Sequence, residues 1–202
     1  MTVHGILVAA GRGERFGGPK HAALLRGRPL WEWAADALRR GGVHEVVLVG
    51  DLPGGIPGGR RRRDSVQAGL DALPAAASHV LVHDAARPLA SPELVRRVID
   101  RLLAGGVDAV VPVVAVRDTL KRVGDGWVVE TLERRGVAAA QTPQGFRVAV
   151  LRAAHQAGDE DAGDDAVLVE RMGGSVACVE GEVANLKVTY PSDLALAEAW
   201  LP

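Results

Sequence analysis

The sequence predicts an α/β protein: a three-layer α/β/α, Rossmann-like sheet from which one β-arm protrudes. Strand-like and helix-like segments alternate from end to end, as they do when helices cover both faces of a parallel sheet. Hydrophobic residues make up 48% of the chain and aromatic residues only 3%, so the core must consist of Val, Leu and Ala, the usual residues of a parallel sheet. The alternation breaks once, at about residues 116–135, where the pattern is that of a hairpin.

The elements of the alternating core follow from periodicity and from capping residues. A continuous apolar run is typical of a strand buried on both faces. Ser91-Pro92-Glu93 is a helix start, with a capping serine and a proline in the first turn, and Asp64 or Ser65 can cap another helix. We therefore expect strands at residues 3–10, 45–50, 79–83, 108–114 and 175–180, and helices at 30–40, 64–73, 91–105, 146–156, 164–172 and 192–200.

Residues 116–135 contain two short alternating segments around Gly124-Asp125-Gly126. Such a pattern predicts a β-hairpin, which interrupts the core and projects from it as the β-arm. The chain shows no internal repeat and no linker. We therefore expect a single domain over residues 1–202.

Composition excludes several classes of function. The formal net charge is −1, from 24 basic and 25 acidic residues, so no global field attracts nucleic acid or an anionic membrane. No apolar run approaches the ~20 residues of a spanning helix. Cys178 is the only cysteine, which excludes an internal disulfide, and we expect it to lie in the core. With no cationic leader at the start, these features predict a cytoplasmic protein.

The loop from Gly11 to Lys20 is the strongest candidate for a phosphate site. It leaves the first predicted strand, and ligands of open α/β sheets bind beyond the carboxyl ends of strands. Glycines such as Gly13 let backbone N–H groups approach phosphate oxygens, while Arg15 and Lys20 add cations that can clamp a triphosphate. A dinucleotide fingerprint requires a third glycine where Phe16 stands, and a Walker A loop requires Ser or Thr after its lysine. The alternative is a surface turn with incidental charges.

Two other segments can meet a ligand near the same edge. Asp84 closes the third predicted strand, where an acid can hold a hydroxyl or a metal–phosphate complex; its structural alternative is an ion pair with Arg87. The basic run at residues 60–63 is typical of a solvated turn, although one of its arginines or the hydroxyl of Ser65 could meet a nucleotide.

Lys187 lies among apolar residues near the C-terminus. A partly buried lysine needs an anionic partner, which is either a substrate phosphate or a structural carboxylate. The histidines lack ligand spacing, so we expect no protein-built metal site, and no nucleophile motif is present.

Several segments carry a resemblance to a known family when they are taken in order. They are residues 9–11 through 19–20, 64–66, 83–88, 117–119, 142–144, 185–189 and 191–198. In this order they resemble the 2-C-methyl-D-erythritol 4-phosphate cytidylyltransferase family of the non-mevalonate isoprenoid pathway. The resemblance covers residues 3 to about 201, which is nearly the whole chain.

The resemblance implies a nucleotidyltransferase sheet and the transfer of CMP from CTP to the polyol phosphate, with Mg²⁺ or another divalent cation held mainly by the triphosphate. It implies that Arg15 and Lys20 stabilise the charge of the pentacoordinate phosphorus. It further implies nucleotide contacts from Ala10, Gly11, Gly13, Gly59 and Ser65, and substrate contacts from Asp84, Arg87, Thr119, Arg134 and Lys187. Family members are homodimers joined by the β-arm, so Arg134 and Thr119 are expected to complete the neighbour's site, where Arg134 and Lys187 hold the polyol phosphate in line for attack.

Two positions depart from the family pattern. The stretch from Arg15 to Lys20 is shorter than in the family, and Gly163 stands where the family usually has a threonine that contacts substrate phosphate. The nearest alternative is a ribitol-5-phosphate cytidylyltransferase, since the two sites share most of the same residues. A non-catalytic nucleotide-binding regulatory domain is the alternative from another class, and Phe16 disfavours a Rossmann oxidoreductase.

Overall fold

The central sheet has seven strands in a computed structural model that describes residues 2–11, 13–158 and 161–201. Its order is β11 (Val176–Glu180), β6 (Ala109–Ala115), β10 (Gln144–Arg147), β5 (His79–Asp84), β1 (Val3–Val8) and β4 (Val46–Val49), with β9 (Ala138–Ala140) also paired to β6. Strands β10 and β9 run antiparallel to their neighbours, whereas the other pairs are parallel. The carboxyl ends of β1, β4 and β5 therefore meet at one edge, as the sequence predicts.

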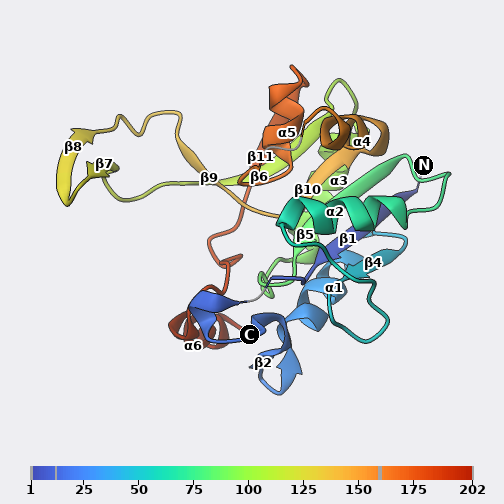
Figure 1. Ribbon diagram of the computed structural model, residues 1–202, viewed down its shortest axis with the longest axis horizontal. Helices are drawn as coiled ribbons and strands as arrows, with labels where there is room; N and C mark the ends of the chain where they lie inside the picture. Colours follow the sequence, from blue (N-terminus) through green and yellow to red (C-terminus); the bar gives the residue numbers. More distant parts are fainter. Residues whose placement is uncertain (1, 12, 159–160, 202) are drawn as a thin grey trace.

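Helices cover both faces of this sheet (Figure 1). They are α1 (Leu30–Arg40) and α3 (Pro92–Leu103) on one face, and α2 (Arg62–Asp71), α4 (Val148–Gln156) and α5 (Ala166–Arg171) on the other. Successive residues of a strand point to opposite faces: Ile6 packs in the cluster of α2, α4 and α5, and Leu7 packs in that of α1 and α3. The predicted three-layer α/β/α class is confirmed.

A third cluster holds the C-terminal helix α6 (Pro191–Trp200) beside the sheet. Its buried members are Leu25, Leu30, Val188 and Ala197. Leu25 belongs to a small hairpin of β2 (Leu24–Leu25) and β3 (Arg28–Pro29) that the sequence did not predict. This packing ties the segment around Val188, next to Lys187, to the start of α1.

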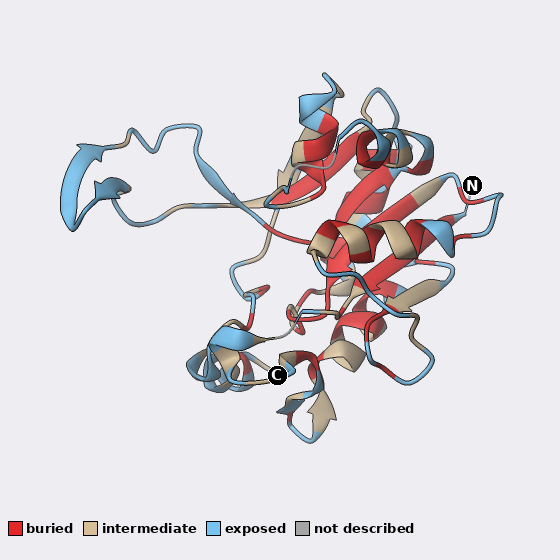
Figure 2. Cartoon of the chain, in the orientation of Figure 1, coloured by how far each residue is buried: buried red, intermediate tan, exposed pale blue. Residues whose placement is uncertain are grey.

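Strands β7 (Lys121–Gly124) and β8 (Trp127–Thr131) pair with each other and with no other strand of the described residues. Figure 1 shows this hairpin standing away from the sheet, and Figure 2 shows it exposed along its length. Asp125 and Gly126 have positive φ angles of 49° and 81°, as a tight hairpin turn requires. The hairpin leaves Trp127 77% exposed.

Three local expectations were wrong. Phe146 lies in strand β10 rather than in a helix, because its side chain completes the core between β5 and β6. Helix α2 begins at Arg62, so Asp64 stands in its first turn and accepts the N–H of Arg61 instead of capping from outside. Cys178 is exposed, since β11 is the edge strand of the sheet.

Within the described ranges, no helix combines the length and apolar character needed to cross a membrane.

Candidate active site

The loop after β1 turns back on itself through Gly13. The carbonyl of Gly13 accepts hydrogen bonds from the N–H groups of residues 16–18. Gly13 has a φ of 66°, and a Cβ there would lie 1.8 Å from the carbonyl oxygen of Gly18, so only glycine fits. Because these N–H groups are used inside the loop, this part of it is not the open phosphate nest that the sequence suggested. It presents the side chains of Arg15 and Lys20 instead.

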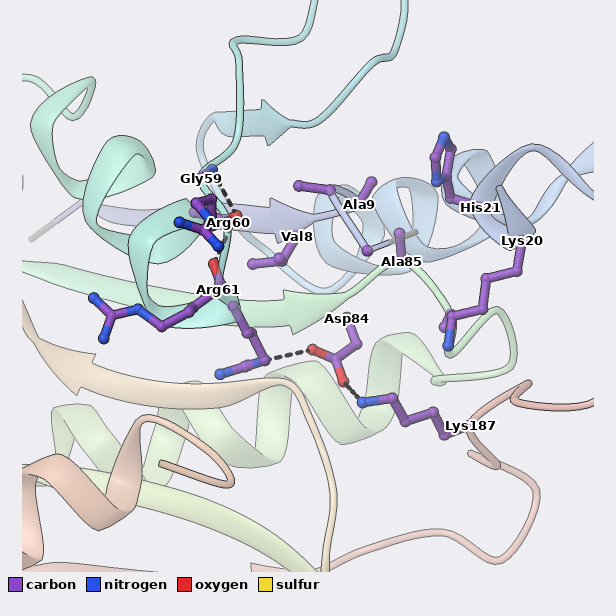
Figure 3. A pocket seen from close by; sticks show the side chains of 15 residues that line it. Val8, Ala9, Lys20, His21, Gly59, Arg60, Arg61, Asp84, Ala85 and Lys187 are labelled. Atoms are coloured by element: carbon purple, nitrogen blue, oxygen red, sulfur yellow. Dashed lines mark hydrogen bonds and ion pairs between the residues drawn. The ribbon is translucent and has the colours of Figure 1, made fainter. Parts of the chain in front are cut away.

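A pocket of about 150 Å³ opens where β1 and β5 end (Figure 3). It brings together residues from five separate segments of the chain: Ala10 and Gly11, Lys20, Gly59 and Ser65, Asp84, and Lys187. All of them were expected at the site from the sequence. Lys20 lines the pocket. The stretch from Arg15 to Lys20, although shorter than in the family, is therefore long enough for Lys20 to reach the site.

Asp84, the last residue of β5, holds the centre of the pocket. Its Oδ1 lies 3.1 Å from Nε of Arg62 and its Oδ2 lies 2.7 Å from Nζ of Lys187. Burial alone would raise the pKa of Asp84, but the positive charges of Arg62, Lys187 and Arg87 outweigh it and hold that pKa far below its usual range. The ion pair with Arg87, which the sequence left open as the structural alternative, is not the one that forms, because Arg62 and Lys187 make the direct contacts with Asp84.

Lys20 adds a second ammonium to the pocket. Figure 3 shows its side chain directed from the loop toward Asp84 and Lys187. Burial and the nearby charge of Lys187 lower the pKa of Lys20, and Asp84 only partly opposes them. Two ammonium groups beside one carboxylate leave the pocket with excess positive charge, which an anionic ligand can neutralise.

Arg62 is a site residue that sequence reasoning did not single out from its run of arginines. Its Nε binds Asp84, and its Nη1 lies 2.5 Å from Oδ2 of Asp165, which comes from the start of α5. Burial would lower the pKa of Arg62, but the two carboxylates raise it instead. Arg62 differs from the other arginines of the run because it is the first residue of α2 and faces the end of β5. No sequence pattern reveals which arginine of the run takes this position.

Gly59 and Ser65 close the pocket on the side of α2. The hydroxyl of Ser65 accepts the N–H of Gly59 at 3.1 Å and donates to the carbonyl of Arg61 at 3.3 Å. A Cβ on Gly59 would lie 2.2 Å from Cβ of Asp64, so the loop approaches the helix too closely for any larger residue. The backbone N–H of Gly59 and the hydroxyl of Ser65, both expected to contact the nucleotide, are therefore held in place by their mutual hydrogen bond.

A second, wider hollow of about 580 Å³ adjoins the pocket and shares Gly11, Lys20 and Arg60 with it. Gly13 and Arg15 line this hollow. The guanidinium of Arg15 lies 5.9 Å from the ring centroid of Tyr190, within the range of a cation–π contact. The two spaces thus form one continuous site, with Lys20 at their junction.

Arg87 supports the site from behind. It donates to the carbonyl of Asn185 at 2.8 Å, and the amide of Gln141 holds the same segment through the carbonyl of Glu182. This segment carries Lys187. Arg87 is therefore bonded to the loop that presents Lys187, and it does not line the pocket.

Arg134 and Thr119 lie elsewhere in the chain. They line a shared hollow at the base of the β7–β8 hairpin, and Arg134 donates to the carbonyl of Arg117 at 2.5 Å. Neither residue lines the pocket of Asp84 in the same chain.

The described residues contain no cluster of three His, Cys, Asp or Glu side chains that could bind a metal. Among the lining residues Asp84 is the sole carboxylate of the pocket, and two cations already occupy its oxygens. The charged side chains that line the pocket are therefore mainly cationic, which suits an anionic ligand.

Comparison with known proteins agrees with this geometry. A sequence profile of the 2-C-methyl-D-erythritol 4-phosphate cytidylyltransferase family matches residues 3–202. The enzyme of that name from Frankia casuarinae is 47% identical over 98% of this chain and 81% of its own, and that from Prochlorococcus marinus is 40% identical over 98% and 97%. The crystal structure of the Thermus thermophilus enzyme superposes with a TM-score of 0.85 at 38% identity, covering 98% of both chains. The chain belongs to the 2-C-methyl-D-erythritol 4-phosphate cytidylyltransferase family.

Proposed function

We propose that this protein transfers CMP from CTP to 2-C-methyl-D-erythritol 4-phosphate, giving 4-diphosphocytidyl-2-C-methyl-D-erythritol and pyrophosphate. The observation that carries the proposal is the meeting of Lys20, Asp84 and Lys187 in a pocket that continues into the hollow of Arg15. The pocket suits a nucleoside and the hollow suits its phosphates. Family membership supplies the identity of the two substrates.

In this proposal, small residues and their backbone groups bind the nucleotide. Ala10, Gly11 and Gly59 wall the pocket with little side-chain bulk, so their backbone groups can approach the cytosine and its ribose. The hydroxyl of Ser65 is already oriented by Gly59. Gly13 contributes by shaping the turn that carries the triphosphate-binding cations.

Arg15 and Lys20 hold the triphosphate and stabilise the charge that gathers on the α-phosphorus during transfer. Lys20 suits this task because it stands at the junction of the pocket and the hollow. Cations placed where negative charge develops lower the barrier without reorganising during the reaction.

The polyol phosphate is held by Lys187, while Asp84 accepts hydrogen bonds from the polyol hydroxyls. An oxygen of this phosphate attacks the α-phosphorus of CTP; the bond from that phosphorus to the bridging oxygen breaks, and its electron pair leaves with pyrophosphate. The attacking phosphate is already ionised at neutral pH, so no protein base is needed. What the protein supplies is in-line alignment and positive charge.

A divalent cation, Mg²⁺ in the simplest case, accompanies the triphosphate and neutralises part of its charge. The lining residues suit this arrangement, because their charged side chains are cationic except for one carboxylate, which is already paired.

We further propose a homodimer joined through the β-arm, with Arg134 and Thr119 of each subunit completing the neighbour's site. The arm exposes apolar residues that a partner can cover: Val123, Trp127, Val128 and Val129. Arg134, whose charge suits a substrate phosphate, lies in the hollow of the arm and away from its own pocket. Arg87 acts on the substrate indirectly, by holding the loop of Lys187.

The near-neutral charge and single cysteine support a cytoplasmic enzyme whose partners are small molecules and its own copy, with neither nucleic acid nor membrane among them.

The proposal is tested by measuring pyrophosphate release with CTP, UTP, ATP or GTP, each paired with methylerythritol phosphate and Mg²⁺. We expect turnover with CTP and its loss in Lys20→Ala. Ribitol 5-phosphate is assayed beside methylerythritol phosphate, and faster turnover with it would favour the ribitol enzyme instead. Binding of CTP without product from either polyol phosphate would favour the regulatory domain.

A further inference from the structure

Asp165 is a buried carboxylate outside the pocket. It precedes α5 and is only 1% exposed. Its Oδ2 lies 2.5 Å from Nη1 of Arg62, and its Oδ1 lies 3.4 Å from Nε2 of His155 in α4. A buried carboxylate is costly unless it is paired. The short contact with Arg62 is the stronger of its two interactions.

Arg62 spans the space between Asp165 and the pocket. While Nη1 contacts Asp165, Nε contacts Asp84 at 3.1 Å. The remaining nitrogen, Nη2, is buried and makes no hydrogen bond within the described part of the chain. The direction of this planar group is therefore set by the two carboxylates, one on each side.

This geometry limits how Arg62 can bind Asp84. A guanidinium prefers to grip one carboxylate with two parallel N–H groups. The nitrogen that would join Nε in such a contact is Nη2, which lies on the same edge of the guanidinium and makes no hydrogen bond within the described residues. The contact of Nη1 with Asp165 holds the group so that only Nε meets Asp84, at Oδ1, and Oδ2 is left to Lys187. Without the charge of Asp165, nothing opposes a two-pronged contact between Arg62 and Asp84, which would turn Asp84 away from Lys187.

We propose that Asp165 is a positioning residue for nucleotidyl transfer: by holding Arg62 from behind, it keeps one oxygen of Asp84 facing Lys187 and the incoming polyol phosphate. The inference rests on the proposed function, since it assigns Asp84 and Lys187 to the polyol substrate. It extends the site by a residue that touches neither substrate.

The test compares Asp165→Asn with Asp164→Asn. Asp164 is the neighbouring carboxylate, but it accepts hydrogen bonds from Val167 N and from the side chain of Gln144. Both variants remove a charge at the start of α5, so both are expected to lower the unfolding temperature. We expect kcat to fall by roughly tenfold or more in Asp165→Asn alone, with the Kd for CTP changed less than about threefold.

A second comparison shows whether the effect passes through Arg62. The Arg62→Lys variant lacks the planar guanidinium. Adding Asp165→Asn to it should lower kcat by a much smaller factor than adding Asp165→Asn to the wild type, because the effects of substitutions at coupled residues are not additive. If Asp165→Asn does not fold, Asp165→Glu keeps the charge but displaces the carboxylate, and we expect it to lower kcat with unchanged CTP affinity.

The inference is overturned by wild-type kcat in the folded Asp165 variant, by an equal loss in Asp164→Asn, or by equal factors in the two Arg62 backgrounds. These outcomes differ from a failure of the proposed function, in which the wild-type protein itself forms no product.

Discussion

Nζ of Lys187 lies 2.7 Å from Oδ2 of Asp84, so the ammonium assigned to the polyol phosphate is paired with the carboxylate assigned to the polyol hydroxyls. Lys187 is the freer partner, because its side chain is 40% exposed and that of Asp84 is 10% exposed. On the proposed assignment, a phosphate that enters the site would draw Lys187 toward itself and free Oδ2 for a hydroxyl. One exchange of partners accommodates both ends of the polyol substrate.

Replacement of Lys187 by alanine should lower kcat/KM for methylerythritol phosphate by about 10² or more, the scale of losing one charged contact to the reacting groups. The affinity for CTP should change little, because the triphosphate is assigned to Arg15 and Lys20. Steady-state kinetics with varied polyol phosphate, together with calorimetry of CTP binding, measure both effects.

Arg101→Ala is the matched control for Lys187→Ala. It removes a half-buried cation whose exposed hydrogen bond goes to the carbonyl of Gly105, just beyond α3, so its kinetics should match the wild type. Equal weakening of CTP and polyol phosphate by Lys187→Ala would contradict the assignment of this lysine to the polyol.

Lys20→Met should separate activity from stability. Burial and Lys187 lower the pKa of Lys20, so the folded state disfavours its charged form relative to the unfolded chain. At neutral pH, which lies below the ordinary pKa of a lysine, that charge therefore lowers the free energy of unfolding. We expect the variant to lose about 10² in kcat while its unfolding temperature stays equal to or above that of the wild type.

Arg15→Ala provides the comparison for Lys20→Met. We expect a similar loss of kcat, of about 10², and little change in the unfolding temperature, since Arg15 is exposed. Wild-type turnover in Arg15→Ala would remove this residue from the triphosphate clamp, and a strong loss of stability in Lys20→Met would contradict the charge argument.

Much of this site could be predicted because strand ends are readable in sequence. Apolar runs that stop at Gly11 and Asp84 place both residues at one edge of a parallel sheet, and the structure brings them into one pocket. The helix at residues 30–40 was also predicted with the bounds that the structure gives it, because its apolar face is periodic and two glycines follow it.

What could not be predicted depends on packing between distant segments. Arg62 and Asp165 are 103 positions apart, and they meet only because α2 and α5 cover the same face of the sheet. Strand β10 was missed because it is short and leads directly into α4, and periodicity does not distinguish a short buried strand from a helix turn. Likewise, edge position rather than local pattern decides the exposure of Cys178.

His83 should make stability depend on pH. It is fully buried beside Asp84, its Nδ1 lies 2.8 Å from Oγ1 of Thr142, and burial lowers its pKa to about 4. Between its ordinary pKa of about 6.5 and this lowered value, the unfolded chain binds a proton that the folded state does not, so the free energy of unfolding falls as pH falls. The lowered pKa corresponds to roughly 3 kcal/mol lost across this window.

Urea unfolding of the wild type and of His83→Asn, whose amide can replace Nδ1, isolates this effect from other titrating groups. As pH drops through this window, the free energy of unfolding of the wild type should fall more than that of His83→Asn. His44→Asn, at an exposed position, is the control and should follow the wild type. Parallel curves for wild type and His83→Asn would exclude the buried neutral histidine as the cause.

Mixed dimers should reveal which subunit supplies Arg134. Arg134 lies at the base of the arm, and Lys20 lies in the pocket. Arg134→Ala and Lys20→Ala homodimers should each be nearly inactive. If Arg134 serves the neighbour's pocket, a heterodimer of the two variants regains one complete site, with Lys20 from one subunit and Arg134 from the other. Its kcat per dimer should be about half that of the wild type, as expected for independent sites.

The two variants are co-expressed with different affinity tags, and the heterodimer is purified through both. Dimer mass by light scattering verifies that the species assayed is the heterodimer. If Arg134 instead served its own chain's pocket, each subunit of the heterodimer would still lack one cation and activity would stay at the level of the two homodimers. Restored activity therefore requires an arm that carries Arg134 across the interface, because no arrangement within one chain gives a complete set of cations in that protein.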